Sequence, residues 1–268
     1  MSTNRYERQS FLGEKSQHLF GTANIAVIGL GGGGSHIVQQ CAHVGFQNFL
    51  DFDPDVIEDT NLNRLIGGTA RDVAAATPKI EIAERIIKGL QPDAKVDSYQ
   101  SRWQEHAAAL KTSDLIFSAV DSYQERHEIE VFSRRYMIPM IDMGMEVRED
   151  SEGSFSMFGQ VILSLPGSPC MRCMGFLTDE KLSQEARRYG DVGSVPQVVW
   201  ANGVLASIAV GLSIELLTNW TKAKLPPLFL TYDGKRCIVQ PRPIVALVGD
   251  TCQHFPLENV GDPIFRSL

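Results

Sequence analysis

Residues 24–64 read NIAVIGLGGGGSHIVQQCAHVGFQNFLDFDPDVIEDTNLNR, and this stretch decides the fold. The apolar run at 25–28 predicts a buried strand, and a glycine-rich turn follows it at once. Gly29, Gly31 and Gly34 have the spacing G-x-G-x-x-G. Glycines at these positions let the chain turn tightly and bring backbone N–H groups close to a phosphate. The stretch therefore predicts a nucleotide-binding turn.

A helix, a second strand and a polar loop complete this unit. Residues 35–44 predict a helix whose amino end can hold an anion. Residues 48–52 predict a strand that ends in Asp53. This carboxylate lies about 20 residues past Gly34, the spacing of an acid that binds the ribose of a nucleotide. The polar loop at 59–64 follows, and its residues indicate which kind of reaction the bound nucleotide takes part in.

The chain after this unit continues to alternate between strand and helix. Strands are expected at 96–99, 114–121 and 139–143, with helices at 73–90 and 122–136. The pattern then changes to a loosely alternating strand at 155–165 and a hairpin at 228–240. We therefore predict an α/β fold, with a Rossmann-like, mainly parallel sheet flanked by helices and continued by an antiparallel strand region. Asp121, at the end of its strand, should share a rim with Gly29 and Asp53.

Two further segments have a distinct character. Residues 178–196 are polar, contain Gly190 and Gly193, and are interpreted as a mobile loop over a site. Residues 198–217 predict a long apolar helix that is interrupted by polar groups such as Asn202. We expect this helix to lie in the core or at a subunit interface rather than in a membrane.

Composition limits the class of protein. The chain has 268 residues and a net charge of −7, which argues against a nucleic-acid partner because such partners usually need a basic face. The polar start at 1–17 lacks a signal sequence, so we expect a cytoplasmic protein without a membrane span. Five cysteines, with one Cys-x-x-Cys pair, favour a reducing compartment and a metal site over disulfides.

An ordered set of residues gives the chain a family resemblance. The glycine-rich turn 29–35 is followed by Asp53, then Asn61-Leu62-Asn63-Arg64, Lys79 and Asp121. In this order they resemble the ThiF/MoeB/HesA adenylyltransferases, which form the core of ubiquitin-activating enzymes, and the likeness covers about residues 5–255. It implies one domain over 1–268: an N-terminal arm (1–23), a nucleotide-binding half (24–145) and a zinc- and partner-binding half (146–268).

The resemblance implies an enzyme that adenylates a carboxylate. Its relatives use ATP and Mg²⁺ to activate the C-terminal glycine of a ubiquitin-like or sulfur-carrier protein as an acyl-adenylate, with release of pyrophosphate. By this likeness the ATP-binding residues are Gly29, Gly31, Gly32, Gly34, Asp53, Asn61, Arg64 and Lys79. The catalytic residues are Arg8, Arg64, Lys79 and Asp121. Asp121 would hold the magnesium ion.

The resemblance also implies partners. Arg8 matches an arginine that reaches the ATP site of the other subunit, which implies a homodimer. Some relatives form a thioester on a cysteine that follows the Cys-x-x-Cys pair, but residues 174–236 contain no cysteine. We therefore expect no thioester on this chain. The adenylate would pass to a thiol on a partner, such as a conjugating-enzyme-like protein, or to an external sulfur donor, or it would be the end product, as in MoeB-type relatives.

A structural zinc site is the second expectation from the likeness. Relatives with zinc use two Cys-x-x-Cys pairs, whereas this chain keeps only Cys170 and Cys173. Cys252 and His254 appear in place of the second pair, and three cysteines with one histidine suit tetrahedral zinc. Cys237 is the alternative fourth ligand. The simplest alternative is that these are reduced residues that bind no metal.

A narrower likeness concerns three short motifs. The motifs lie at 194–200 (Ser-x-Pro-Gln-Val-Val-Trp), 202–204 (Asn-Gly-Val) and 261–263 (Gly-Asp-Pro). They resemble stand-alone bacterial ThiF proteins encoded in ubiquitination-like operons. Membership of this subgroup would imply that a ubiquitin-like protein is a partner of the chain.

Other functions stay open from the sequence. Within the same chemistry, the substrate could instead be a small or tRNA-attached carboxylate, as in dehydratase-like relatives. The glycine-rich turn alone also suits an NAD-dependent oxidoreductase, but that function leaves the loop at 61–64 and Lys79 without a role. An inactive scaffold is a third alternative, and the retention of Arg64, Lys79 and Asp121 argues against it.

Overall fold

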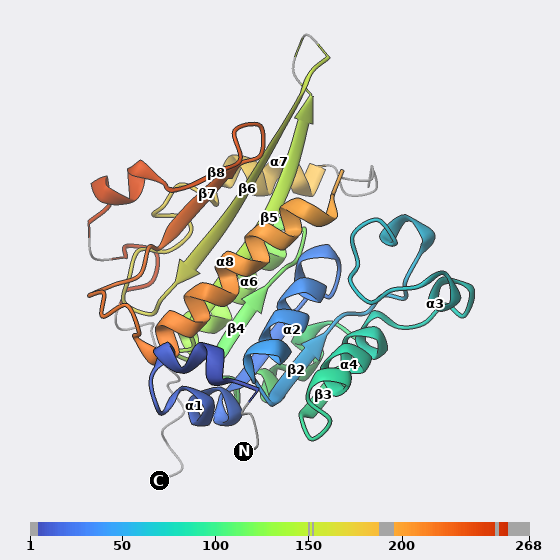
Figure 1. Cartoon of the computed structure of the whole chain (residues 1–268). Coiled ribbons are helices and arrows are strands. Elements are labelled where there is room, and N and C mark those ends of the chain that lie inside the picture. Colours follow the sequence, from blue (N-terminus) through green and yellow to red (C-terminus); the bar gives the residue numbers. More distant parts are fainter. Residues whose placement is uncertain (1–4, 150, 152, 188–195, 250–251, 257–268) are drawn as a thin grey trace.

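The computed structural model describes residues 5–149, 151, 153–187, 196–249 and 252–256. Its strands form one eight-stranded sheet in the order β3-β2-β1-β4-β5-β6-β7-β8 (Figure 1). Gly190, Gly193, Ser194 and the motif at 261–263, which the sequence analysis singled out, lie outside the described residues.

The first five strands form the parallel part of the sheet. They are β1 (Asn24–Ile28), β2 (Asn48–Phe52), β3 (Lys95–Tyr99), β4 (Leu115–Ser118) and β5 (Met140–Glu149). β1 pairs with β2 on one side and with β4 on the other, and all these pairings are parallel. The strand order therefore reverses between β1 and β4, which creates a crevice at the carboxyl ends of these strands.

The last three strands are antiparallel. They are β6 (Phe155–Ser164), β7 (Phe229–Asp233) and β8 (Ile238–Pro241). β5 and β6 form a long hairpin, paired from Met140↔Ser164 to Glu149↔Phe155, whose tip extends beyond the rest of the sheet (Figure 1). The predicted fold class, a mainly parallel Rossmann-like sheet continued by antiparallel strands, is confirmed.

Helices cover both faces of the sheet. α2 (Gly32–Val44) packs against α4 (Lys79–Leu90) and α8 (Val199–Thr218), so these three share one face. α6 (Tyr123–Arg135) follows β4, on the other side of the reversal, and right-handed crossover places it on the opposite face. α8 is long and apolar enough to cross a membrane, but it packs against β5, β6 and α2 with nine buried residues, as a core helix does.

The remaining elements are short. They are η1 (Glu7–Leu12), α1 (Ser16–Thr22), η2 (Asp59–Asn61), α3 (Ala70–Ala74), η3 (Trp103–His106), α5 (Ala107–Leu110), α7 (Asp179–Arg187) and η4 (Pro243–Leu247). The helix expected at 73–90 is therefore two helices, separated before Pro78. A proline disfavours a helical conformation in the residue that precedes it.

α7 corrects part of the loop expected at 178–196. The described part of this segment forms a helix, because Thr178 caps its start by accepting a hydrogen bond from Lys181 N at 3.2 Å. None of its residues is buried, and only Leu182 and Ala186 in this helix are apolar, too few to form an apolar stripe that could reveal it. Its Glu185 accepts hydrogen bonds from the backbone N–H groups of Tyr123 and Gln124, both at 2.8 Å, and thereby holds α7 against the first turn of α6.

Candidate active site

A pocket opens at the carboxyl ends of β1, β2 and β4, where the strand order reverses. Most of the residues predicted to bind nucleotide line it: Gly29, Gly31, Gly32, Asp53, Asn61, Arg64, Lys79 and Asp121. Ligands of open α/β sheets bind at such a reversal. The structure thus brings together residues that lie up to 92 positions apart in the sequence.

The glycine turn shapes the floor of the pocket. Gly29 has φ +86°, and a Cβ there would lie 2.8 Å from the carbonyl oxygen of Ala119. A Cβ on Gly34 would lie 1.9 Å from the carbonyl oxygen of Gly29, so Gly34 serves helix–strand packing beneath the pocket. A Cβ on Gly31 would meet open space, which leaves room for a ligand to approach the backbone. The first-turn N–H groups of α2 have no intrahelical partner and no side-chain cap.

Asp53 stabilises this turn from below. Its Oδ2 accepts a hydrogen bond from Leu30 N at 2.6 Å, and its Oδ1 accepts one from Asp55 N at 2.9 Å. Burial raises the pKa of Asp53, while Lys79 and the backbone donors act in the opposite direction. A carboxylate has more than two lone-pair sites, so Asp53 can still accept hydrogen bonds from two ribose hydroxyls.

Two cationic side chains lie at the pocket wall. Lys79, the first residue of α4, has its Nζ 2.7 Å from Asp55 Oδ2 and 3.9 Å from Asp53 Oδ1. Arg64 donates through Nη1 to Thr60 O at 2.6 Å and to Asn63 Oδ1 at 3.0 Å, which fixes the guanidinium beside the glycine turn. Two cations and a helix amino end around one cavity favour a multiply charged anion.

Asp121 lies exposed at the rim, in the connection between β4 and α6. Its Oδ1 accepts a hydrogen bond from Gln197 Nε2 at 2.9 Å. Oxygen ligands suit Mg²⁺, which usually takes one or two carboxylates together with substrate phosphates. Asp121, an exposed carboxylate at the rim of a pocket lined by cationic side chains, fits that pattern. The N-cap of α6 is Ser122, whose Oγ accepts from Glu125 N at 3.1 Å, so Asp121 itself has no capping role.

Arg126 is a pocket residue that the sequence analysis missed. Its Nη1 forms an ion pair with the fully buried Asp142 of β5, and its Nη2 donates to the carbonyl oxygen of Val120. This bond fixes the connection that carries Asp121. Other lining residues missed by sequence reasoning are Ser101, Arg102, Trp103, Glu125, Gln197 and Asn202. For Asn202, a lone amide early in an apolar helix was the available signal.

Arg8 lies far from this pocket within its own chain. It belongs to η1, whose Gln9 donates through Nε2 to Val44 O at 2.7 Å. Val44 ends α2, whereas the pocket lies at the start of α2, about 20 Å away at 1.5 Å per residue. Arg8 is exposed and does not line the pocket. The trans role that the sequence suggests stays a prediction.

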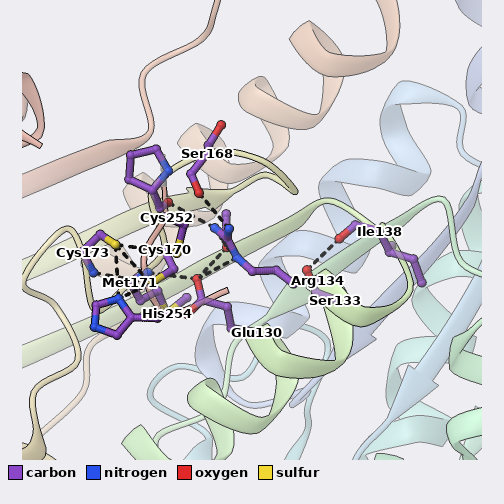
Figure 2. A network of polar contacts seen from close by, with 12 residues as sticks. Glu130, Ser133, Arg134, Ile138, Ser168, Cys170, Met171, Cys173, Cys252 and His254 are labelled. Atoms are coloured by element: carbon purple, nitrogen blue, oxygen red, sulfur yellow. Dashed lines mark hydrogen bonds and ion pairs between the residues drawn. The ribbon is translucent and has the colours of Figure 1, made fainter. Parts of the chain in front are cut away.

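A second cluster of predicted site residues lies between the loop after β6 and the C-terminal segment. Cys170, Cys173, Cys252 and His254 point toward one another, and their ligand atoms all lie within 4.8 Å (Figure 2). The Cys170–Cys173 and Cys173–Cys252 sulfur distances are 3.6 and 3.7 Å. His254 Nδ1 lies 3.5 Å from Cys170 Sγ and 3.3 Å from Cys173 Sγ.

These distances suit a tetrahedral ion. Zinc–sulfur bonds of about 2.3 Å place tetrahedral sulfurs roughly 3.8 Å apart. Cys237, the alternative fourth ligand, lies instead in the turn between β7 and β8, where its Sγ faces Gly234 O at 3.7 Å. The residues present therefore fit a Cys₃His site with His254 as the fourth ligand.

Buried charged residues of α6 support this cluster. Glu130 Oε1 accepts hydrogen bonds from Met171 N at 2.9 Å and from Ser164 Oγ at 2.6 Å. Arg134 donates to the carbonyl oxygens of Ser168 at 2.7 Å and Pro169 at 3.1 Å (Figure 2). The loop that presents Cys170 is thus fixed to the same helix that follows Asp121.

The fold and the pocket define the class of protein. A parallel sheet whose strand order reverses beside a glycine turn, with a buried carboxylate and two cations at the same rim, is the arrangement of nucleotide-binding α/β proteins. The profile of the ThiF family matches residues 4–253, and the chain belongs to this family.

Named relatives are similar to this chain in sequence, and a solved structure is similar to it in fold. The SAMP-activating enzyme E1 of Haloferax volcanii is 29% identical over 63% of this chain and 61% of that protein. The sulfur carrier protein adenylyltransferase of Thermus thermophilus is 27% identical over 63% of both chains. This chain thus matches less than two thirds of the length of either relative. The crystal structure of Escherichia coli MccB with ATP superposes with a TM-score of 0.72 and 18% identity, over 90% of this chain and 72% of that chain.

Proposed function

We propose that the protein is an ATP-dependent adenylyltransferase that activates the C-terminal glycine carboxylate of a ubiquitin-like or sulfur-carrier protein. The observation that carries this proposal is the convergence of the α2 amino end, Arg64, Lys79 and Asp121 on one pocket. The relatives named above, one an E1 and one a sulfur carrier adenylyltransferase, support a protein substrate.

The chemistry explains why these groups are needed. A carboxylate oxygen attacks the α-phosphorus of ATP, a phosphorus–oxygen bond forms, and the bond to the bridging oxygen of pyrophosphate breaks. Both reactants are anionic, so the site must offset their repulsion and align the attack. Arg64 and Lys79 supply positive charge at fixed positions, and Asp121 would hold Mg²⁺, which neutralises charge on the phosphates.

The ion pairs of Lys79 suit this role. In the free protein its ammonium group lies between Asp53 and Asp55, with 11% of the side chain exposed. A triphosphate offers this group more negative charge than the exposed Asp55 does, so Lys79 can move from Asp55 to phosphate without leaving the pocket. Hydride transfer occurs at the nicotinamide ring and develops no charge at the phosphates, so a cation at this place contributes to the chemical step of adenylation and not to that of oxidoreduction.

Two further elements of the proposal concern the rest of the chain. We propose a structural zinc ion at Cys170, Cys173, Cys252 and His254, which would join the C-terminal segment to the loop after β6. We also propose a homodimer in which Arg8 reaches the pocket of the partner. Exposed Trp200 and Val204 on α8 and Phe11 near Trp220 offer apolar surface for that contact.

The direct test of this proposal is detection of the adenylated product. A candidate ubiquitin-like protein that ends in glycine is mixed with the enzyme, ATP and Mg²⁺, and its intact mass is measured. The proposal predicts a species heavier by one adenylyl group, and removal of the terminal glycine should abolish it. Adenylation of a small or tRNA-attached carboxylate instead would establish the alternative substrate class.

A further inference from the structure

Asn202 presents an unpaired amide to the pocket. It lies in the first turns of α8, its side chain is 3% exposed, and it is one of the residues that line the pocket. Its Nδ2 is buried and has no hydrogen-bond partner among the described residues. A buried donor without a partner costs about 1–3 kcal/mol, so its presence calls for a reason beyond folding.

The position of this amide indicates what it binds. A Cβ built on Gly32 would lie 2.3 Å from Asn202 Nδ2 and 3.3 Å from Arg64 Cδ. Asn202 and Arg64 therefore meet at Gly32, the residue of the glycine turn at which α2 begins. Two kinds of donor share this place, the free N–H groups of α2 and the carboxamide, and the aliphatic part of the Arg64 side chain passes beside them.

Donors that converge on one point form an anion site. Gly32 has no room for a side chain because Asn202 occupies that room. The packing of α8 against α2 fixes the amide at this place.

We propose that the Asn202 carboxamide is a positioning ligand for the phosphate chain of the bound nucleotide, donating from Nδ2 beside Gly32 and Arg64. This proposal rests on the proposed function only because it takes ATP as the ligand. The hydrogen bond orients the phosphates without adding charge. It also makes the amino end of α8 a fourth wall of the site, in addition to the glycine turn, the Arg64 loop and Lys79.

The free protein gives the first test. Asn202→Leu keeps the approximate shape of the side chain and removes the unpaired amide. A ligand role predicts that the nucleotide-free variant unfolds at the wild-type temperature or above it, since no bond is lost. A structural role predicts a clearly lower unfolding temperature. Ser207→Ala, an exposed change on the same helix, serves as the matched control.

Nucleotide binding gives the decisive test, by calorimetry with adenosine and with ATP. Asn202→Leu should weaken ATP binding about tenfold, and Asn202→Asp should weaken it more, because a carboxylate repels phosphate. Both variants should bind adenosine as the wild type does. Equal loss for adenosine and ATP, or no loss for either, overturns the role of Asn202 while leaving the proposed function intact. Wild-type protein that binds no nucleotide overturns both.

Discussion

Gln197 donates a hydrogen bond from Nε2 to Asp121 Oδ1 at 2.9 Å, across 76 positions of sequence. Gln197 precedes α8, and its carbonyl oxygen also accepts from Asn63 Nδ2 at 3.3 Å. The segment before α8 thus connects the predicted magnesium ligand to the loop that carries Arg64. A hydrogen bond to one carboxylate oxygen orients the other, as outer partners of metal ligands do.

This arrangement predicts different results at the two positions. Asp121→Ala should reduce magnesium-dependent adenylation about 100-fold or more without unfolding the protein. Gln197→Ala should keep the maximal rate but raise the magnesium concentration needed by roughly tenfold. Magnesium titrations of the exchange of labelled pyrophosphate into ATP measure both, with Gln184→Ala on exposed α7 as control. Unchanged turnover in Asp121→Ala would remove this carboxylate from the site.

The distance of Arg8 from its own pocket predicts complementation between subunits. Arg8→Ala and Arg64→Ala should each be inactive, yet a mixture that exchanges subunits should regain about a quarter of wild-type activity, because each mixed dimer keeps one intact site. Mixed dimers of wild type with the Arg8→Ala, Arg64→Ala double variant should have none. The opposite pattern, active dimers in the second mixture alone, would place Arg8 in its own chain's site. Native mass spectrometry shows that the mixed dimers form.

The Cys₃His cluster predicts a stability that depends on metal. Cys170→Ser should lower bound zinc, measured by elemental analysis, and lower the unfolding temperature by several degrees. A chelator should have the same effect on the wild type and little effect on the variant. Cys237→Ser, in the exposed turn between β7 and β8, should change neither quantity. Wild-type protein purified without zinc contradicts the site.

Asp51 predicts a pH dependence of stability that is independent of activity. Its carboxyl group is fully buried on β2, and neither oxygen has a partner among the described residues. Burial, with a further contribution from Glu84, raises the pKa of Asp51 to about 8. The folded state therefore favours the neutral acid, and the free energy of unfolding should fall as pH rises from about 4 to about 8.

Asp51→Asn removes this ionisation. The variant should gain stability over the wild type through that pH range, reaching roughly 4 kcal/mol at neutral pH. Denaturant unfolding at acidic, neutral and alkaline pH measures the difference. Asp97→Asn, a half-exposed change on β3 that removes a carboxylate paired with Lys95, is the control and should shift little. Parallel stability curves for Asp51→Asn and wild type would show that Asp51 is ionised in the folded state.

Local patterns predicted the parallel half of the sheet. The glycine turn and Asp53 are recognisable because turn, strand end and spacing all lie within one contiguous unit. The ion pair between Arg126 and Asp142 was not predictable in the same way, because a buried pair between a helix and a strand has no sequence period. The same holds for Asn202, whose importance comes only from the contact between α8 and α2.

The second half of the chain shows the same limit of prediction from sequence. The Cys-x-x-Cys pair pointed to a metal, but the choice between His254 and Cys237 needed the fold, which brings the C-terminal segment to the loop after β6. α7 was missed because a helix with no buried residue and only two apolar side chains leaves too weak an apolar pattern.

Exchange of labelled pyrophosphate into ATP reports the reversible formation of an acyl-adenylate and is the measurement to make first. Adenylation of a protein carboxylate predicts exchange that requires Mg²⁺ and a ubiquitin-like or sulfur-carrier protein ending in glycine. Lys79→Ala should abolish this exchange. Exchange supported by small carboxylates or tRNA, but by no such protein, would contradict the proposed substrate. Absence of exchange with every carboxylate, in protein that binds ATP, would contradict adenylation itself.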